Sequence, residues 1–546
     1  MRFQKNFSIV FIVILFLNLF LPPTSVKALP TNEISSTNIK PLISSVFKVI
    51  DFNNIVYFAF SSESFLKRFD LTSKTWLADI ALSGFPTGIA VDSDGIYISF
   101  DRRTVRIDLN GLNETHLRNT STTGIELFTC SDYLFINDGK DYTSINKLTG
   151  DLISTKSFFY SQGGIVPACG IDRVFASSTS IGPADILMWP INSDGSPGNM
   201  VDSPYHGDFN IGSRNFISLD QQRLFNSAGI IYNTIDLTYS NSLGGSFDQL
   251  AFYGDQPIVS RGNEVFGYSN VFLETGRLAL SYNPMKLIVF EEEIILFRLD
   301  GETISFETRN INDLEMPTPY QPIDPLGLDF TPDQIEIDKN EIIYLLSKNF
   351  MNIFRWSIAE RKYLSSIPLI SSPDHFSYDS INDRLYTGYA NGNIYLIDLN
   401  GDLREQAFVN TPISVDGLAN AGEYLFAYDP SGNWGTHITY DKNGQLISSK
   451  DWNYFSREYV WSNVLRKMYF FRDQISPNDL IWENIDSNGI IGDHMDSPYH
   501  SSTGIENPIR ISPNGSTVLL GSGRIYNPIT LEQINSLSNN IKDATW

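Results

Sequence analysis

Residues 88–111 read GIAVDSDGIYISFDRRTVRIDLNG, and this stretch decides the fold. It predicts two strands joined by a tight turn, because an Asp-Gly pair between alternating apolar residues is typical of a β-hairpin. A third strand follows at Val105–Leu109 and ends at Asn110-Gly111. A more polar fourth strand completes each unit, as at Asp151–Phe158. Four short antiparallel strands in about 40 residues are typical of one blade of a β-propeller.

The same plan recurs along the chain. Residues 378–401 read YDSINDRLYTGYANGNIYLIDLNG, and residues 511–531 read ISPNGSTVLLGSGRIYNPITL. No window shows a sustained apolar period of 3.6 residues, so we expect no helical layer. The predicted fold class is therefore all-β and built from repeated blades.

A longer repeat contains these blades. The pentapeptide DSPYH stands at residues 202–206 and again at residues 496–500, which is 294 residues later. The pentapeptide IDLNG stands at residues 107–111 and again at residues 397–401. The chain is thus a large internal duplication, and we expect two related β-propellers in tandem.

The units can be counted along each copy. In the first copy, residues 46–319, they begin near residues 46, 86, 122, 162, 208, 246 and 280, which predicts a seven-bladed ring. In the second copy, residues 320–546, they begin near residues 330, 373, 413, 456 and 503. Trp546 aligns with Phe252 in the sixth unit of the first copy, so the second ring has about five to six blades and comes out incomplete.

Three alternatives for the second ring stay open. A propeller leaves two sheet edges exposed unless its last blade meets its first. Either the second ring closes with about six blades in an altered way, or the sequence is a piece of a longer protein. A rival idea is that residues 29–45, otherwise a linker, supply a closing strand.

The blades resemble a known superfamily. Residues 378–401 and 88–111, with the Asp-Arg-Leu-Tyr of residues 383–386 and the Ile-Asp-Leu that ends the third strand, resemble the YVTN/WD40-like propellers and their NHL-type blades. The Ser-Pro-Tyr-His element with residues 519–526, LLGSGRIY, is similar to large secreted bacterial tandem propellers. The resemblance implies a propeller fold on an exported protein of uncharacterised function, and a fold alone implies no activity.

The first 28 residues predict a secretory signal peptide. Arg2 and Lys5 precede an apolar run from Phe7 to Leu21, and a small-residue cleavage site follows at residues 26–28. The run is shorter than the ~20 residues that span a bilayer, although an uncleaved membrane anchor is the alternative. No later segment is apolar enough to span a membrane. We therefore expect a secreted or cell-surface location.

The charge excludes two classes of partner. Lys and Arg number 39 against 62 Asp and Glu, for a formal net charge of −23. Binding to nucleic acid or to anionic lipid needs clustered basic residues, so neither is expected. The expected partner is a protein or a carbohydrate outside the cell or on its surface.

The duplicated pentapeptide supplies the candidate ligand-binding residues. Each copy follows the outer strand of one blade and precedes the inner strand of the next, where loops on a propeller commonly bind ligands. In the functional interpretation, Asp202 pairs with His206, and Asp496 pairs with His500. In the structural interpretation, these side chains only tie loops together by hydrogen bonds. The candidates are Asp202, Tyr205, His206, Asp496, Tyr499 and His500.

The two cysteines and the acidic turns leave further options. Cys130 and Cys169 each end the first strand of adjacent units, so a disulfide between them is possible in an exported protein. The sequence does not show whether the two Cα atoms are close enough for the bond, because Cα atoms more than ~7 Å apart cannot be bridged. The Asp-rich turns at residues 92–95, 398–402 and 486–489 resemble fragments of calcium loops, but none completes the pattern and turn chemistry explains them better. We expect no catalytic residues, no metal site and no cofactor, with calcium as a weak alternative.

Two functions remain. The first is an exported, non-enzymatic propeller scaffold that binds a protein or glycan through a loop face. The second is a secreted propeller hydrolase, similar to lactonases, with its site at a channel mouth. The enzyme would need several Asp, Glu, Asn or His side chains converging on one axis, and a sequence cannot show convergence.

Overall fold

The computed structural model describes residues 46–120, 123–301, 303–430, 435–473, 478–499 and 504–546. These residues form β-strands and two 3-10 turns, η1 (Cys169–Ile171) and η2 (Ile311–Asp313), with no α-helix among them. The strands make twelve antiparallel sheets, of which eleven have four strands and one has three. The prediction of an all-β chain of tandem β-propellers is confirmed.

Seven sheets form the first ring, and each uses consecutive strands. Their bounds are β1 Val46–Phe52, β2 Ile55–Phe60, β3 Phe65–Asp70, β4 Thr75–Ala81; β5 Gly88–Asp92, β6 Gly95–Phe100, β7 Arg103–Ile107, β8 Thr115–Asn119; β9 Glu126–Cys130, β10 Tyr133–Asn137, β11 Asp141–Asn146, β12 Leu152–Ser157; β13 Gln162–Ala168, β14 Arg173–Ser178, β15 Ile186–Pro190, β16 Val201–Asp202; β17 Asn215–Ile217, β18 Arg223–Asn226, β19 Ile230–Asn233, β20 Tyr239–Ser242; β21 Gln249–Tyr253, β22 Gln256–Arg261, β23 Glu264–Tyr268, β24 Glu274–Ala279; β25 Lys286–Phe290, β26 Glu293–Asp300, β27 Thr303–Asn310.

Five sheets form the second ring in the same way. Their bounds are β28 Gln334–Ile337, β29 Ile342–Ser347, β30 Asn352–Ser357, β31 Lys362–Pro368; β32 His375–Asp379, β33 Arg384–Gly388, β34 Asn393–Asp398, β35 Glu405–Asn410; β36 Gly417–Ala421, β37 Tyr424–Asp429, β38 Gly435–Tyr440, β39 Leu446–Trp452; β40 Phe455–Ser462, β41 Lys467–Asp473, β42 Asp479–Ile485, β43 Ile491–Asp496; β44 Ile509–Ile511, β45 Val518–Leu520, β46 Arg524–Tyr526, β47 Gln533–Ser536.

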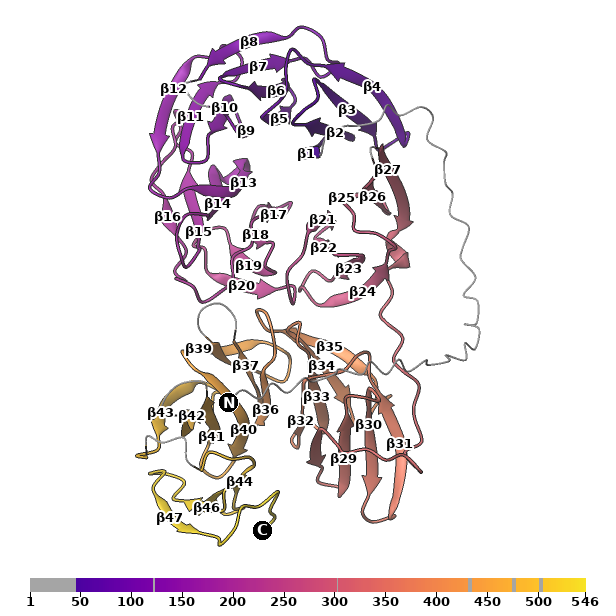
Figure 1. Ribbon diagram of the computed structural model, residues 1–546, viewed down its shortest axis with the longest axis vertical. Helices are drawn as coiled ribbons and strands as arrows, with labels where there is room; N and C mark the ends of the chain where they lie inside the picture. The colour runs from indigo at the N-terminus through magenta and orange to yellow at the C-terminus, as the bar shows by residue number, and fades with distance from the viewer. Residues whose placement is uncertain (1–45, 121–122, 302, 431–434, 474–477, 500–503) are drawn as a thin grey trace, which may run out of the picture. The chain divides into compact units, whose positions relative to one another are not determined.

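Each sheet runs from the centre of its ring to the rim. In the first ring, strands such as β1, β5 and β9 lie inside, and β4, β8 and β12 lie at the rim (Figure 1). The middle strands are the most apolar, and all six residues of β6 are buried. The rim strand β12 has no buried residue, and four of its six residues are exposed. This gradient explains why the sequence shows apolar runs followed by a more polar fourth strand.

The turn at residues 92–95 has the expected chemistry. The Asp92 carboxylate accepts a hydrogen bond from the Asp94 backbone N–H at 2.8 Å. Gly95 has φ +155°, and a Cβ atom there would lie 2.7 Å from the Ile107 carbonyl oxygen. The turn therefore needs glycine both for its backbone angle and for the close approach of the next strand.

Side chains close the first ring. Apolar clusters fill each seam between successive sheets, including the seam where the last sheet, β25–β27, meets the first, β1–β4. At that seam the Phe69 ring lies 5.1 Å from Phe297 and 4.6 Å from Phe306. Lys286 pairs with Asp51 at 3.4 Å on the inner strands. The closure thus comes from packing, because no strand ladder among the described residues joins the two sheets.

One sheet departs from the predicted four-strand plan. The sheet β25–β27 has three strands. After η2 the chain pairs with the neighbouring sheet instead, because Arg277 of β24 exchanges backbone hydrogen bonds with Glu315. The segment that was expected to form a fourth strand is therefore used to extend the previous sheet.

One seam of the second ring has no apolar cluster among the described residues. Apolar clusters join its five sheets in succession from β28–β31 to β44–β47. Within the described ranges, no cluster joins β44–β47 back to β28–β31. The predicted signal peptide, residues 1–28, and the predicted linker or closing strand, residues 29–45, lie outside the described residues. In the part of the chain that is described, no helix has the length and apolar character to cross a membrane.

Candidate functional site

The first copy of the pentapeptide is tied to one buried carboxylate. The Ser203 hydroxyl donates a hydrogen bond to Asp185 Oδ1, and the Ser203 N–H donates to the Ile186 carbonyl at 2.9 Å. His206 Nδ1 lies 3.2 Å from Asp185 Oδ2, while 73% of the histidine side chain is exposed. The structure therefore pairs His206 with Asp185 rather than with Asp202, because Asp185 immediately precedes β15, the neighbouring strand of the same sheet.

The second copy repeats part of this arrangement. The Ser497 hydroxyl donates to Asp479 Oδ1, and the Ser497 N–H donates to the Leu480 carbonyl at 3.0 Å. Arg472 lies 3.6 Å from Asp479 and 2.8 Å from Asp496. Asp496 thus pairs with a guanidinium, and His500 lies outside the described residues.

Tyr205 and Tyr499, the tyrosines of the two pentapeptide copies, accept the same kind of hydrogen bond. The Tyr205 hydroxyl accepts a hydrogen bond from the Tyr239 backbone N–H, and the Tyr499 hydroxyl accepts one from the Gln533 N–H, both at 3.0 Å. Each bond ties the crossover to the rim strand of the next sheet, β20 or β47. The structural role of this position is therefore the same in both rings.

This geometry is not that of a nucleophile. In a serine hydrolase the hydroxyl bonds to an imidazole, which removes its proton. Here the Ser203 hydroxyl donates to the Asp185 carboxylate instead. Burial raises the pKa of Asp185, although the Ser203 and Ile186 hydrogen bonds oppose that shift. The group is a buried acceptor that holds the loop.

Two matched substitutions measure how much the hydrogen bond to each tyrosine hydroxyl contributes to stability. Tyr205→Phe is expected to lower the free energy of unfolding by about 1–2 kcal/mol, because a half-buried backbone N–H loses its acceptor. Tyr499→Phe should cost less, since Tyr499 is exposed and water can replace the hydroxyl. Urea denaturation of both variants gives the comparison. An equal loss in the two variants would contradict this account.

The structure also brings together groups that the sequence did not suggest. Glu336 of β28, Glu458 of β40 and Arg510 of β44 interact electrostatically from inner strands of the second ring. Burial raises the pKa of Glu336 to about 7, with Arg510 opposing. Burial also raises the pKa of Glu458, which accepts a hydrogen bond from Asn507 Nδ2 at 2.5 Å. Glu458 has φ +61° at a bulge, a strained backbone that often marks a functional position.

The Glu336 carboxyl is expected to make the stability of the fold depend on pH. Because the pKa of Glu336 is about 7 in the folded state and about 4.5 in the unfolded chain, the folded state binds more protons than the unfolded state between pH 4.5 and 7. Stability should therefore fall as pH rises from about 4.5 to 7. The free energy of unfolding of Glu336→Gln should equal that of the native chain at pH 4. At pH 8 it should be higher than that of the native chain by roughly 2 kcal/mol, a value reduced to allow for partial exposure of the side chain. Thermal unfolding at both pH values tests this, and equal curves at pH 8 would refute it.

The calcium-like turns are held by internal contacts. Lys147 Nζ lies 2.9 Å from Asp92 and 2.7 Å from Asp94. Burial alone would lower the pKa of Lys147, but hydrogen bonds to Asp94 and Asp92 raise it overall. The Asp486 carboxylate accepts backbone hydrogen bonds from Asn488 and Ile490 within its own turn. Across the described ranges, no group of three His, Cys, Asp or Glu residues is placed to hold a metal ion.

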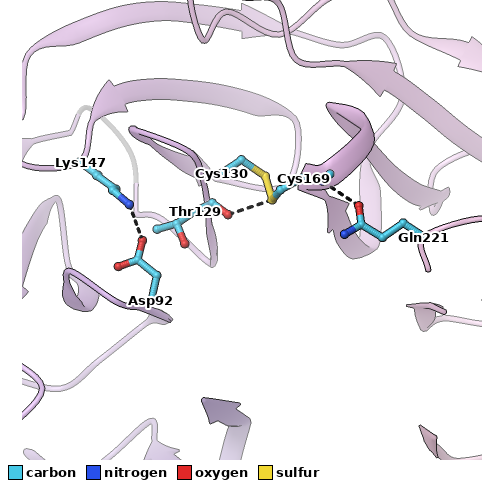
Figure 2. Close-up of a disulfide and its surroundings, with 7 residues drawn as sticks. Asp92, Thr129, Cys130, Lys147, Cys169 and Gln221 are labelled. Carbon is cyan, nitrogen blue, oxygen red and sulfur yellow. Dashed lines mark hydrogen bonds and ion pairs between the residues drawn. A yellow bond between two sulfur atoms is a disulfide. The ribbon is translucent and has the colours of Figure 1, made fainter. Parts of the chain in front are cut away.

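Cys130 and Cys169, whose pairing the sequence left open, are joined by a disulfide with their Cα atoms 5.3 Å apart. Figure 2 shows the bond between the end of β9 and the start of η1, which follows the next inner strand, β13. Beside it the Gly170 N–H donates to Gln221 Oε1 at 2.7 Å. The disulfide therefore links two adjacent sheets near the centre of the first ring.

His437 of β38 lies in a buried side-chain network of the second ring. Its Nδ1 lies 2.5 Å from Glu483 Oε2, and its Nε2 lies 3.1 Å from the Tyr459 hydroxyl. Lys450 Nζ donates to Glu483 Oε1 at 2.8 Å. Burial would raise the pKa of Glu483, but the His437 and Lys450 contacts lower it overall. Because His437 and Glu483 are fully buried, this network supports the fold rather than a ligand.

Comparisons with known proteins add little to this geometry. No family model matches the chain, and no curated protein matches it. Among solved structures, the chain is similar to hydrazine synthase of Kuenenia stuttgartiensis, with 10% identity over 50% of this chain and 98% of that chain and a TM-score of 0.38. It is also similar to the WD40 β-propeller domain of Doa1, with 11% identity over 50% and 95% of the two chains and a TM-score of 0.38. Likeness at this level carries no argument by itself, and the propeller assignment rests on the sheets.

Proposed function

We propose that the chain is an exported, non-enzymatic β-propeller scaffold that binds a protein or a glycan through a loop face. Within this proposal it is a YVTN/WD40-like, NHL-like propeller, secreted or held at the cell surface, and it needs no cofactor. The observation that supports it most is the first pentapeptide loop, in which internal hydrogen bonds fix Ser203 and Tyr205 while His206 stays exposed.

A fixed loop with exposed side chains suits recognition. Ser203 is held by Asp185 and Tyr205 by the next sheet, so the loop loses little conformational freedom when a partner binds. The net charge of −23 favours partners with basic groups or partners bridged by cations. Such binding should weaken as the salt concentration rises.

The experiment compares two exposed histidines. The full chain is applied to immobilised glycans and to immobilised basic peptides, with His206→Ala as the test variant and His116→Ala as the matched control. We expect His206→Ala to weaken the strongest binding about tenfold or more, as at a contact near an interface centre, and His116→Ala to leave it unchanged. Equal binding by both variants would refute the loop-face proposal.

A secreted, lactonase-like hydrolase is the second candidate. Its supporting observation is the pair of carboxyls with raised pKa, Glu336 and Glu458, which share Arg510 as an electrostatic neighbour. Such groups suit general acid and base chemistry near neutral pH. Turnover of simple lactones that is abolished by Glu336→Gln or Glu458→Gln would favour this candidate over the scaffold.

A further inference from the structure

The first blades of the two rings match residue by residue. Strands β2–β4 of the first ring and β29–β31 of the second ring align without gaps. Residues that lie across from each other on neighbouring strands of one blade correspond to residues that do the same in the other blade. The facing triplets are Val56, Phe69 and Trp76 in the first ring, and Ile343, Trp356 and Tyr363 in the second. The two blades therefore present the same kind of apolar face in the same register.

In the first ring a β-sheet covers this face. Val56, Phe58 and Phe69 are fully buried in one cluster with Ile288, Ile295, Phe297 and Ile304 of the sheet β25–β27. The Phe58 ring lies 5.1 Å from Phe297. Leu71, just after β3, is 4% exposed in the same cluster. The first ring thus shows that such a face packs against a β-sheet.

In the second ring the corresponding face has no sheet against it among the described residues. We call it the open face and define it by Ile343, Leu345, Trp356, Ile358 and Tyr363. Ile358, the counterpart of Leu71, is 41% exposed. Ile335 and Ile337 of β28 lie directly across from Leu345 and Ile343 and are 60% and 54% exposed.

Parts of the segment before β28 lie over this face: the Phe330 ring packs 4.7 Å from Phe354, which faces Leu345 and is fully buried, and residues 322–326 lie at the rim side. A groove of about 600 Å³ is lined by Trp356, Tyr363 and the segment 322–326. The Ile323 N–H donates to Ser366 Oγ at 2.9 Å, which holds this segment beside β31. Ile335, Ile337 and Ile358 thus remain exposed beside the half-buried Trp356 and Tyr363, and a cluster of exposed apolar side chains is typical of a protein-binding surface.

We propose that the open face binds an antiparallel β-sheet of a partner polypeptide whose contacting side chains are Ile and Phe. The matched face of the first ring accepts such a sheet, and the open face has kept the large apolar residues that this contact requires. A second copy of the chain is a poorer occupant, because two chains of charge −23 repel each other. The surface is distinct from the pentapeptide loop, so the proposal does not depend on the function proposed above.

A peptide from the first ring serves as the probe. The peptide of residues 286–310, KLIVFEEEIILFRLDGETISFETRN, spans β25–β27 and is labelled for fluorescence anisotropy with the full chain. We expect saturable binding that Ile358→Glu weakens at least tenfold, because a charge would then be buried in the contact. Ile381→Glu, at another exposed isoleucine, should leave binding unchanged. A peptide with Ser at positions 288, 295, 297 and 304 should not bind.

Further measurements keep the test decisive. Ile358 is exposed, so Ile358→Glu should fold, and an unchanged unfolding curve checks this. The native peptide should also slow hydrogen exchange of the β29 amides in the unsubstituted chain. Failure to bind, or equal binding to Ile358→Glu, would overturn the proposal. So would sedimentation as a dimer that Ile358→Glu dissociates, because the face would then be a contact between copies.

Discussion

Replacing Cys130 and Cys169 by serine is expected to lower the free energy of unfolding of the first ring by about 4 kcal/mol. The disulfide closes a loop of 39 residues, and a cross-link of that span restricts the unfolded chain by about this amount. The bond joins the inner strand of one sheet to the next, so its loss should loosen a seam near the ring centre. The second ring has no cysteine and should keep its stability.

The measurement is urea denaturation followed by hydrogen exchange in both rings, so that each ring is read separately. Native protein in a reducing agent is the matched control and should behave like the double serine variant. A thiol count on denatured, unreduced protein should find no free thiol. Two free thiols, or a loss of stability confined to the second ring, would contradict the prediction.

Glu483→Ala is expected to destabilise the second ring by about 3–5 kcal/mol. Removing the Glu483 carboxylate leaves Lys450 without its counter-charge and the buried His437 ring without its hydrogen-bond partner. His437 is fully buried and would lose its 2.5 Å contact, and Lys450 would lose its 2.8 Å contact. Trp452 stacks on the His437 ring at a centroid distance of 5.1 Å, so the aromatic packing should loosen as well.

Lys450→Met is the matched control for this network. It removes a partly exposed partner and leaves the contact between Glu483 and His437 in place, so its cost should be smaller. Denaturation curves and near-ultraviolet circular dichroism, which reports the aromatic packing, measure both variants. A larger loss for Lys450→Met than for Glu483→Ala would show that the buried histidine contact contributes little.

Local chemistry made the blades predictable. The Asp-Gly turn at residues 92–95 and the run of six buried residues in β6 depend on neighbours in sequence, so alternation and turn residues were enough to find them. The three-stranded sheet was not predictable, because the pairing of Glu315 with Arg277 depends on the neighbouring sheet. The duplication shows which blades correspond, but it does not show where one of them lacks a strand.

The candidate site was predicted less well, for a physical reason. His206 meets Asp185 across 21 residues, and His437 meets Glu483 across 46. Both contacts depend on the register of strands and on the packing of sheets, which single residues in a sequence do not reveal. The repeated pentapeptide therefore marks the loop, but it does not reveal Asp185 as the neighbour of His206. The inner-strand carboxyl Glu336 looked like one more polar residue in an alternating strand.

The seam between β1–β4 and β25–β27 has a consequence for how such a ring can be cut and rejoined. Every sheet is built from consecutive strands, and this seam is held by side chains without a shared strand ladder. The first ring therefore has no topologically privileged starting point. A circular permutant whose chain begins at another loop between sheets would keep every blade whole. Its two ends would then meet at a different seam, which is also held by side-chain packing.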